Sequence, residues 1–211
     1  MKKTKKIISW LLLLMVTFII LFPYIWMFLL SFKNNTEIMT QPFSFPKSTG
    51  FENYKRVLKT LNLSVMYKNT SLIALIALII SVSASFMCSY CISRLNFKNR
   101  KISSILYFYF IAGLTIPPYI MIFPIYRITM LLGLMNTRIA LILPLAATTL
   151  ALDILLLTGF LRGFPGEIEE AAIIDGCGII RLCLRIVLPI AKPILATVII
   201  FNVIYFWNEF P

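Results

Sequence analysis

Residues 170–176 read Glu-Ala-Ala-Ile-Ile-Asp-Gly, and after nine further residues positions 186–189 read Ile-Val-Leu-Pro. This segment is polar and lies between two strongly apolar ones. Pro165 suits the first turn of a helix, where its missing N–H costs nothing, and the acidic residues that follow favour the positive end of the helix dipole. Gly176 stands where such a helix must stop with a positive φ. The pattern predicts a helix of about three turns over residues 165–175.

One face of this predicted helix is narrow and rich in small side chains. It carries, at helical spacing, Ile168, Ala171, Ala172 and Asp175. Alanines on such a face let the backbone of another protein approach closely, and acidic residues at its rim offer polar anchors. The segment is interpreted as a docking helix. The alternative, on charge pattern alone, is an ordinary solvated loop.

Most of the remaining chain is too apolar for a water-soluble domain. Hydrophobic residues make up 60% and charged residues 13% of the 211 residues, whereas soluble domains are about half apolar and about a quarter charged. The apolar residues fall in runs long enough to cross a bilayer. About five spans are expected, at residues 7–32, 69–93, 102–126, 139–161 and from 193 onward. The expected fold class is all-α, a polytopic transmembrane helical bundle forming a single domain over residues 1–211.

The segments between these spans are expected on alternate sides of the membrane. Residues 33–68 are predicted to form an external loop with a short surface helix at 52–58, and residues 162–192 a cytoplasmic loop. A short external turn is expected at 133–137. The third span contains three helix breakers, which are tolerated where other helices or a polar cavity satisfy the freed backbone groups. They are Gly113, Pro117 and Pro118.

Basic residues account for the formal net charge of +12 and gather on one side of the spans. The clusters are Lys2, Lys3, Lys5 and Lys6; Arg94, Lys98, Arg100 and Lys101; and Arg162, Arg181, Arg185 and Lys192. This is the positive-inside pattern, which predicts a multi-pass membrane protein with its N-terminus in the cytosol. Nucleic-acid binding is disfavoured because basic stripes interleaved with aromatic residues are missing.

The residue types needed for enzymatic or metal chemistry are sparse. The sequence has no His, which removes imidazole base chemistry and His-ligated metals. Cys88 and Cys91 form a C-x-x-C inside an apolar helix without a second ligand pair, so buried packing is the preferred interpretation. No catalytic, cofactor-binding or metal site is predicted.

The loop resembles, residue for residue, the cytoplasmic EAA loop by which the membrane subunits of ATP-binding-cassette (ABC) importers contact their ATPase. The shared pattern is E-A-A-x-x-D-G, nine variable residues, I-x-L-P, and a final proline at Pro193. The external residues 37–54, the turn at 132–137 and residues 207–210 resemble the carbohydrate-type branch. Over essentially its whole length the chain is similar to the smaller permease subunit of maltose-type importers.

The resemblance implies a type I ABC importer permease fold, which has six spans in that family. This chain would lack the sixth span and end inside or just at the end of the fifth, so its C-terminus is expected to be truncated. The location that the resemblance implies is the plasma membrane of a prokaryote. The implied partners are a cytoplasmic ABC ATPase dimer, a second permease subunit in a heterodimer, an external solute-binding protein and the lipid bilayer. ATP-driven closure of the ATPases would move the coupling helices and switch the pore between its two facing states. Carried over to this chain, the coupling residues are Glu170, Ala171, Ala172, Asp175 and Gly176.

Three polar residues in or beside the apolar segments are candidate pore or helix–helix contacts. Asp153 lies in the fourth span, where an acid costs a few kcal/mol and should face a cavity or a partner. A pore-facing role, an interior hydrogen bond and reaching toward the cytosolic interface all remain open for it. Asn208 and Glu209 belong to the Trp-Asn-Glu-Phe ending that the family shares, and Glu209 is interpreted as an anchor between helices rather than a solute ligand.

The function implied is translocation of a sugar or oligosaccharide, with the EAA loop coupling ATPase closure to alternating access. No phosphate-binding G-x-x-x-x-G-K-[ST] is present, so ATP hydrolysis is assigned to the separate partner. Alternatives are a different solute, such as a polyol or a glycerophosphodiester, and a non-functional truncated remnant. A membrane-embedded enzyme is disfavoured because Asp153 and Glu209 lie on different helices with no nucleophile nearby.

Overall fold

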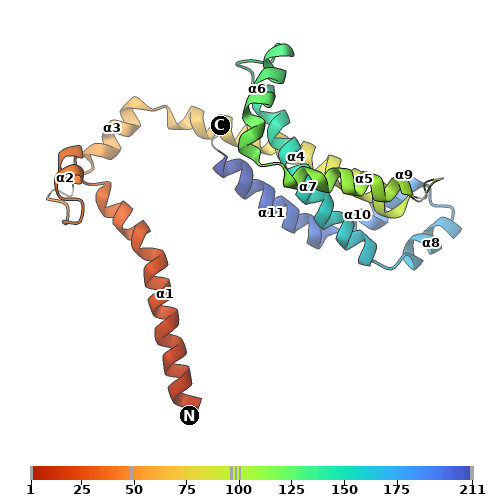
Figure 1. The fold of residues 1–211 in the computed structure, drawn as a ribbon, viewed down its shortest axis with the longest axis horizontal. Helices are drawn as coiled ribbons and strands as arrows, with labels where there is room; N and C mark the ends of the chain where they lie inside the picture. The colour runs from red at the N-terminus through yellow and green to blue at the C-terminus, as the bar shows by residue number, and fades with distance from the viewer. Residues whose placement is uncertain (1, 48–49, 96, 98, 100, 210–211) are drawn as a thin grey trace. The chain divides into compact units, whose positions relative to one another are not determined.

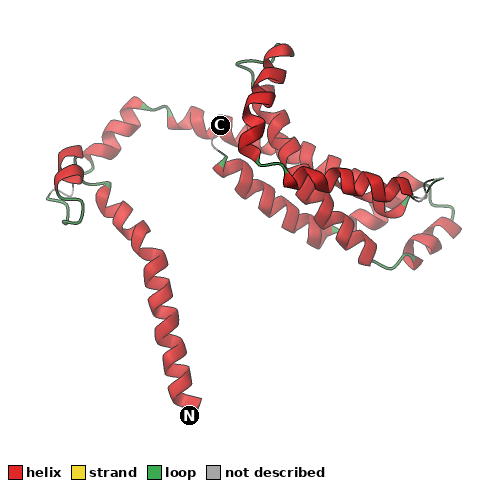
Figure 2. Ribbon diagram, in the orientation of Figure 1, coloured by secondary structure: helices red, strands yellow, loops and turns green. Residues whose placement is uncertain are grey.

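The computed structural model describes residues 2–47, 50–95, 97, 99 and 101–209, and in these residues the only regular secondary structure is helical (Figures 1 and 2). Three helices are long and apolar enough to cross a membrane, or up to five spans if each of two sharply bent helix pairs counts as one. The expected all-α transmembrane class is therefore confirmed. Lys98, Arg100, Phe210 and Pro211, used in the predictions above, lie outside the described residues.

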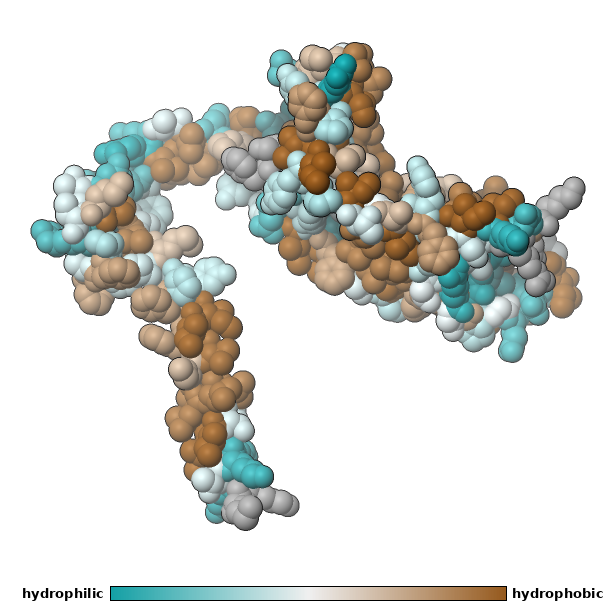
Figure 3. Space-filling model, viewed as in Figure 1, coloured by the Kyte–Doolittle hydropathy of each residue, from teal (hydrophilic) through white to brown (hydrophobic). Residues whose placement is uncertain are grey.

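The chain divides into two compact units, the first ending at Met66 and the second beginning at Tyr67. The first unit opens with α1, Lys2–Leu30, whose apolar side chains are exposed along nearly its whole length. Figure 3 shows this helix as apolar over most of its length, with polar side chains at its N-terminal end. A helix that is apolar all round and unburied within its own chain requires lipid or another protein around it.

The part of the first unit that follows α1 is organised around one buried cation, Lys33, which is 2% exposed. Its Nζ donates hydrogen bonds to Gln41 O (2.8 Å), Pro42 O (3.2 Å) and Ser44 Oγ (3.1 Å). A buried charge is costly unless it is hydrogen-bonded, and here all three ammonium protons have acceptors. The loop after α2 is thereby closed back onto the end of α1.

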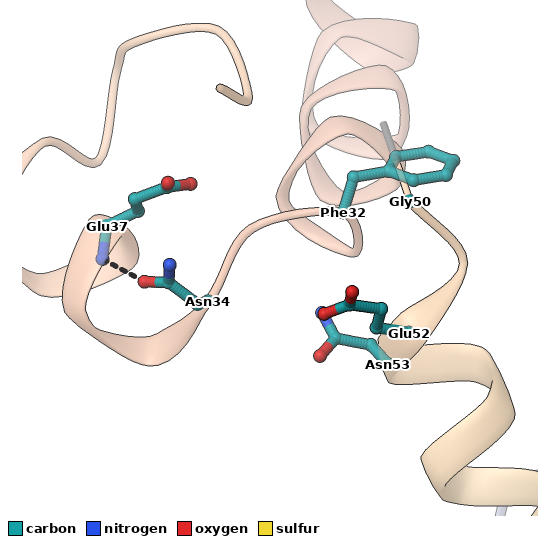
Figure 4. A pocket seen from close by; sticks show the side chains of 6 residues that line it. All are labelled: Phe32, Asn34, Glu37, Gly50, Glu52 and Asn53. Atoms are coloured by element: carbon teal, nitrogen blue, oxygen red, sulfur yellow. Dashed lines mark hydrogen bonds between the residues drawn. The ribbon is translucent and has the colours of Figure 1, made fainter. Parts of the chain in front are cut away.

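Two short helices flank this loop, α2 over Asn35–Thr40 and α3 over Glu52–Thr60. The side chain of Asn34 caps α2 by accepting a hydrogen bond from the Glu37 N–H at 2.7 Å. A hollow of about 60 Å³ lies between α2 and the start of α3 (Figure 4). It is lined by Phe32, Asn34, Glu37, Gly50, Glu52 and Asn53. The expected surface helix at 52–58 is present and extends to Thr60.

The second unit is a bundle whose two longest helices are α4, Leu63–Arg94, and α7, Ile139–Gly163. Helix α4 starts before the expected Asn69, because residues 63–68 contain no Gly or Pro to stop it. The remaining helical segments are α5 (Lys101–Ala112), η1 (Gly113–Thr115), η2 (Pro118–Met121), α6 (Ile122–Leu131), α8 (Glu167–Ile174), α9 (Ile179–Leu182), the π-helical η3 (Cys183–Val187), α10 (Leu188–Ile190) and α11 (Lys192–Asn208).

The third predicted span is sharply bent rather than straight. Residues 101–115 and 118–131 meet at 93°, because Ile116 and Pro117, each followed by a proline, have extended backbone. The breakers noted in this span therefore change its direction. The fifth predicted span is α11, and residues 179–190 before it meet it at 76° where the chain passes Ala191. The turn expected at 133–137 is also present, with positive φ at Gly133 and Asn136.

The core of the bundle consists of two apolar layers contributed mainly by α4, α7 and α11. One layer contains Phe86, Tyr90, Leu157, Leu161, Val187, Ala191, Leu195 and Val198. The other contains Ala77, Ile142, Ala146 and Phe206. Along each of the three helices a stretch of about two to three turns separates the two layers, and this stretch carries buried polar residues.

Replacing Lys33 by Ala should loosen the segment between α1 and α3, because two backbone carbonyls and the Ser44 hydroxyl lose their charged donor. The expected loss of local stability is about 1.5–3 kcal/mol, corresponding to about a tenfold to hundredfold faster proteolytic cleavage within residues 34–53. Timed limited proteolysis of the purified protein measures this rate. Lys55→Ala, at an exposed position on α3, is the matched control, and equal rates for the two variants would show that Lys33 does not hold the loop.

Candidate functional site

The polar loop between α7 and α11 contains the predicted docking helix as α8, over Glu167–Ile174. The helix is shorter than the expected 165–175, because Pro165 and Gly166 precede its first turn. Its end is a Schellman motif around Gly176, whose φ is +79°. The Gly176 N–H donates to Ile173 O and the Cys177 N–H to Ala172 O, each at 2.9 Å. The glycine thus occupies the left-handed position that the sequence predicted for it.

The five predicted coupling residues do not share one surface in the free chain. Four of them are exposed, whereas Ala172 is 9% exposed and is buried against its own chain. The exposed ones are Glu170, Ala171, Asp175 and Gly176. Ile173 and Ile174, which the sequence analysis did not assign, are 57% and 85% exposed. Apolar side chains so exposed on a short polar loop are a signal for a partner surface.

The segment after α8 continues this exposed surface. Ile179, Ile180 and Leu184 are more than half exposed, and with Gly178, Arg181 and Arg185 they line a shallow surface depression. Leu182 and Val187 of this segment are buried, whereas these three apolar side chains lack cover within the described residues of this chain.

The first turn of α8 is tied to the end of α4 by Arg94 and Glu169. Arg94 Nε lies 3.0 Å from Glu169 Oε1, and the two side chains are only 14% and 9% exposed. Arg94 Nη2 also donates to Phe164 O at 2.7 Å, and the guanidinium carbon lies 5.5 Å from the centre of the Phe164 ring. Burial raises the pKa of the Glu169 carboxyl above its ordinary value, and the adjacent Arg94 charge opposes that shift.

Neither member of this ion pair was identified as a site residue from the sequence. Arg94 was assigned only to a basic cluster that marks the cytosolic side, and Glu169 only to the acidic first turn of a helix. Their pairing joins positions separated by most of two membrane spans. Only the tertiary fold brings such positions together.

Asp153 lies in the interior of the bundle and is 0% exposed. Its Oδ2 accepts hydrogen bonds from Ser81 Oγ on α4 (2.9 Å) and from Asn202 Nδ2 on α11 (2.8 Å). Ser85 Oγ lies 3.4 Å from the same oxygen. Thr149 Oγ1 lies 2.6 Å from Ser81 Oγ, and because the single Ser81 proton goes to Asp153, Thr149 donates to Ser81.

This Asp153 cluster, consisting of Ser81, Ser85, Thr149, Asp153 and Asn202, joins three helices in the polar stretch between the two apolar core layers. Of the three roles left open for Asp153, the geometry within this chain matches the interior hydrogen bond. The sequence analysis did not identify its four partners. A signal was present for two of them, since Ser81 and Ser85 belong to a run of small residues at four-residue intervals on α4.

Asn208 and Glu209, the other two polar candidates, lie at the exposed end of α11. Asn208 Nδ2 donates to Ile204 O on the same helix at 2.8 Å, and the Glu209 N–H donates to Tyr205 O at 2.9 Å. The contacts that the structure gives these two residues are thus local to α11. Their assignment as pore or helix–helix residues stays a prediction.

Replacing Asp153 by Ala should destabilise the bundle by about 1–3 kcal/mol, because Ser81 and Asn202 lose their common acceptor in a buried site. Asp153→Asn retains a carbonyl acceptor and should leave membrane insertion intact with a smaller loss. Thermal unfolding in detergent, followed with a thiol-reactive dye, compares the variants. Thr148→Ala, at an exposed position on the same helix, is the control. An Ala variant as stable as wild type, or loss of the Asn variant from the membrane, would contradict this account.

Comparison with known proteins agrees with this arrangement. The family described as "Binding-protein-dependent transport system inner membrane component" matches residues 86–211. A diacetylchitobiose uptake system permease protein of Streptomyces coelicolor is 36% identical, covering 96% of this chain and 66% of that protein. A trehalose/maltose transport system permease protein of Thermococcus litoralis is 34% identical, covering 93% and 70%. The chain thus spans about two thirds of the length of these relatives.

A solved structure shows the same fold. The crystal structure of a bacterial ABC transporter involved in the import of the acidic polysaccharide alginate matches with a TM-score of 0.81 and 23% identity, covering 98% of this chain and 72% of that one. The family match covers more than half of the 211 residues, and the relatives are similar over nearly the whole chain. The protein belongs to the binding-protein-dependent transport system inner membrane component family.

Proposed function

We propose that this chain acts as a membrane-spanning permease subunit of an ABC importer for a sugar or an oligosaccharide. The supporting relatives are named for uptake of diacetylchitobiose and of trehalose or maltose. A further relative, from Agrobacterium fabrum, is a sulfoquinovosyl glycerol transport system permease protein, 31% identical over 191 residues. It supports a glycosylated polyol as the second candidate solute.

The exposed surface of α8 supports the part of this proposal that concerns coupling to the ATPase. Ala171 is exposed beside Glu170 and the two exposed isoleucines, on a short helix whose end is closed by Gly176. Such a surface presents little side-chain bulk at its centre and suits close approach by a cleft of another protein. The proposed occupant is an ABC ATPase dimer that binds and hydrolyses the ATP.

The rest of the proposed assembly follows from the family and from the exposed surfaces of this chain. A second permease subunit would pair with this one, and an external binding protein would deliver the solute. Helix α1 lacks cover within its own unit, which is consistent with contact to lipid or to another subunit. The basic side chains at Lys3, Lys5 and Lys6 support a cytosolic N-terminus.

The solute class is tested by uptake into proteoliposomes. The complex is purified with its ATPase and second permease, and labelled diacetylchitobiose, maltose, trehalose and a glycosylglycerol are supplied with the external binding protein. ATP-dependent accumulation of one of them is expected. A complex that accumulates none of these, yet accumulates a solute without sugar or polyol groups, would overturn the carbohydrate assignment.

Replacing Ala171 by Arg should abolish ATPase association, because a long charged side chain then stands where close approach is needed. The substitution introduces no clash inside the chain, since Ala171 is exposed. A loss of at least about tenfold in the amount of co-purified ATPase is expected. Thr60→Arg, exposed on the external helix α3, is the control and should retain the ATPase. Equal retention by the two variants would exclude α8 as the docking helix.

A further inference from the structure

Arg94 is the last residue of α4, and its side chain contacts the linker before α8 and the first turn of α8. Its guanidinium pairs with Glu169, donates to Phe164 O and stacks near the Phe164 ring. A Cβ built on Gly166 would lie 3.8 Å from Arg94 Nη1, so the backbone at that position also lies against the guanidinium. One side chain of α4 therefore contacts residues 164, 166 and 169.

These contacts differ from a surface ion pair in their burial and in their number. Exposed ion pairs contribute little, because water screens them and two long side chains must be ordered. Here both side chains are nearly buried. Removing one partner of a buried pair leaves the other charge uncompensated, which is strongly unfavourable. The planar guanidinium contacts the Glu169 carboxylate and the Phe164 carbonyl at the same time. A lysine ammonium cannot do so with the same geometry.

Helix α8 is joined to α7 by a short linker that runs from Phe164 to Gly166, and it also contacts α9, which follows it. Arg94 adds an attachment to the end of α4. With the linker and the Arg94 contacts both in place, a displacement of α8 acts on the adjacent ends of α4 and α7 together.

Helix α4 carries that displacement into the membrane. It contains no Gly or Pro between its ends, so it lacks the usual sites of kinking. From Arg94 to Ser81 it rises about 20 Å. Ser81 and Ser85 belong to the Asp153 cluster, which also ties α7 and α11. The ion pair and the cluster thus connect the docking helix to all three core helices.

We infer that Arg94 is a positioning residue that locks the coupling helix α8 to α4 through Glu169 and Phe164, so that movement of the bound ATPase reaches α4 as well as α7. This inference rests on the proposed function. It assigns Arg94 a role in transmission, distinct from ATPase docking, which is assigned to the exposed residues of α8.

The test uses the assembled importer with its ATPase and second permease in proteoliposomes. Arg94→Ala and the nearly isosteric Glu169→Gln are expected to retain the ATPase and its ATP turnover, while solute imported per ATP hydrolysed falls by about tenfold. Arg94→Lys keeps the charge but loses the second contact, and should give an intermediate ratio. Arg162→Ala removes another cytoplasmic arginine, which lies over the Tyr107 ring, and should keep the wild-type ratio.

Hydrogen exchange of residues 164–174 in the same purified complexes supplies a readout that does not depend on transport. Arg94→Ala and Glu169→Gln should exchange about tenfold faster there than wild type, with the α4 and α7 cores unchanged. Unchanged exchange and an unchanged import ratio in the well-folded Glu169→Gln variant would overturn the inference. If wild type imports nothing with ATP, the proposed function fails, and the exchange measurement alone then decides whether Arg94 holds α8.

Discussion

The fold of the second unit depends on the burial of one carboxyl group among three helices. An acid within an apolar span is unfavourable unless polar partners surround it, and Asp153 obtains them from α4 and α11. The three helices must therefore keep one rotation and one register, since a shift of a single residue would move Ser81 or Asn202 away from the carboxylate. Apolar packing between long, similar surfaces lacks such specificity, because many registers bury comparable area. The Asp153 cluster selects one of them.

The apolar layers on either side of that cluster supply packing rather than register. Helix α4 contributes Phe86 and Tyr90 to one layer and Ala77 to the other, and side chains from α7 and α11 pack against them. At the end of α4 a second polar contact, between Arg94 and Glu169, extends the same three-helix core to α8. The bundle thus has polar links at its centre and at the end next to α8, and these are the points where a rigid movement of α8 would be transmitted. The exposed side of α8 remains available to a partner.

Helix breakers shape the parts of the bundle that are not straight. The prolines after Ile116 turn the third predicted span by 93°, and residues 179–190 meet α11 at 76° between Pro189 and Pro193. The first break was visible in the sequence as prolines within an apolar run, because proline removes a backbone donor and restricts the residue before it. The angle was not predictable, since it depends on how the two halves pack against α7 and its neighbours.

The sequence by itself determined the features that depend on residues close together in the chain. The number and class of spans, the short helix before Gly176 and its left-handed end, and the surface helix at α3 all follow from apolar runs, capping residues and breakers within a few residues of one another. The tertiary structure alone decided the partners of Asp153, which lie 49 to 72 residues away, the pairing of Arg94 with Glu169, and the burial of Ala172 away from the exposed side of α8. The physical reason is that hydrogen bonds and ion pairs between helices depend on helix rotation and register. Those are set by the packing of whole helices and leave no short-range pattern in the chain.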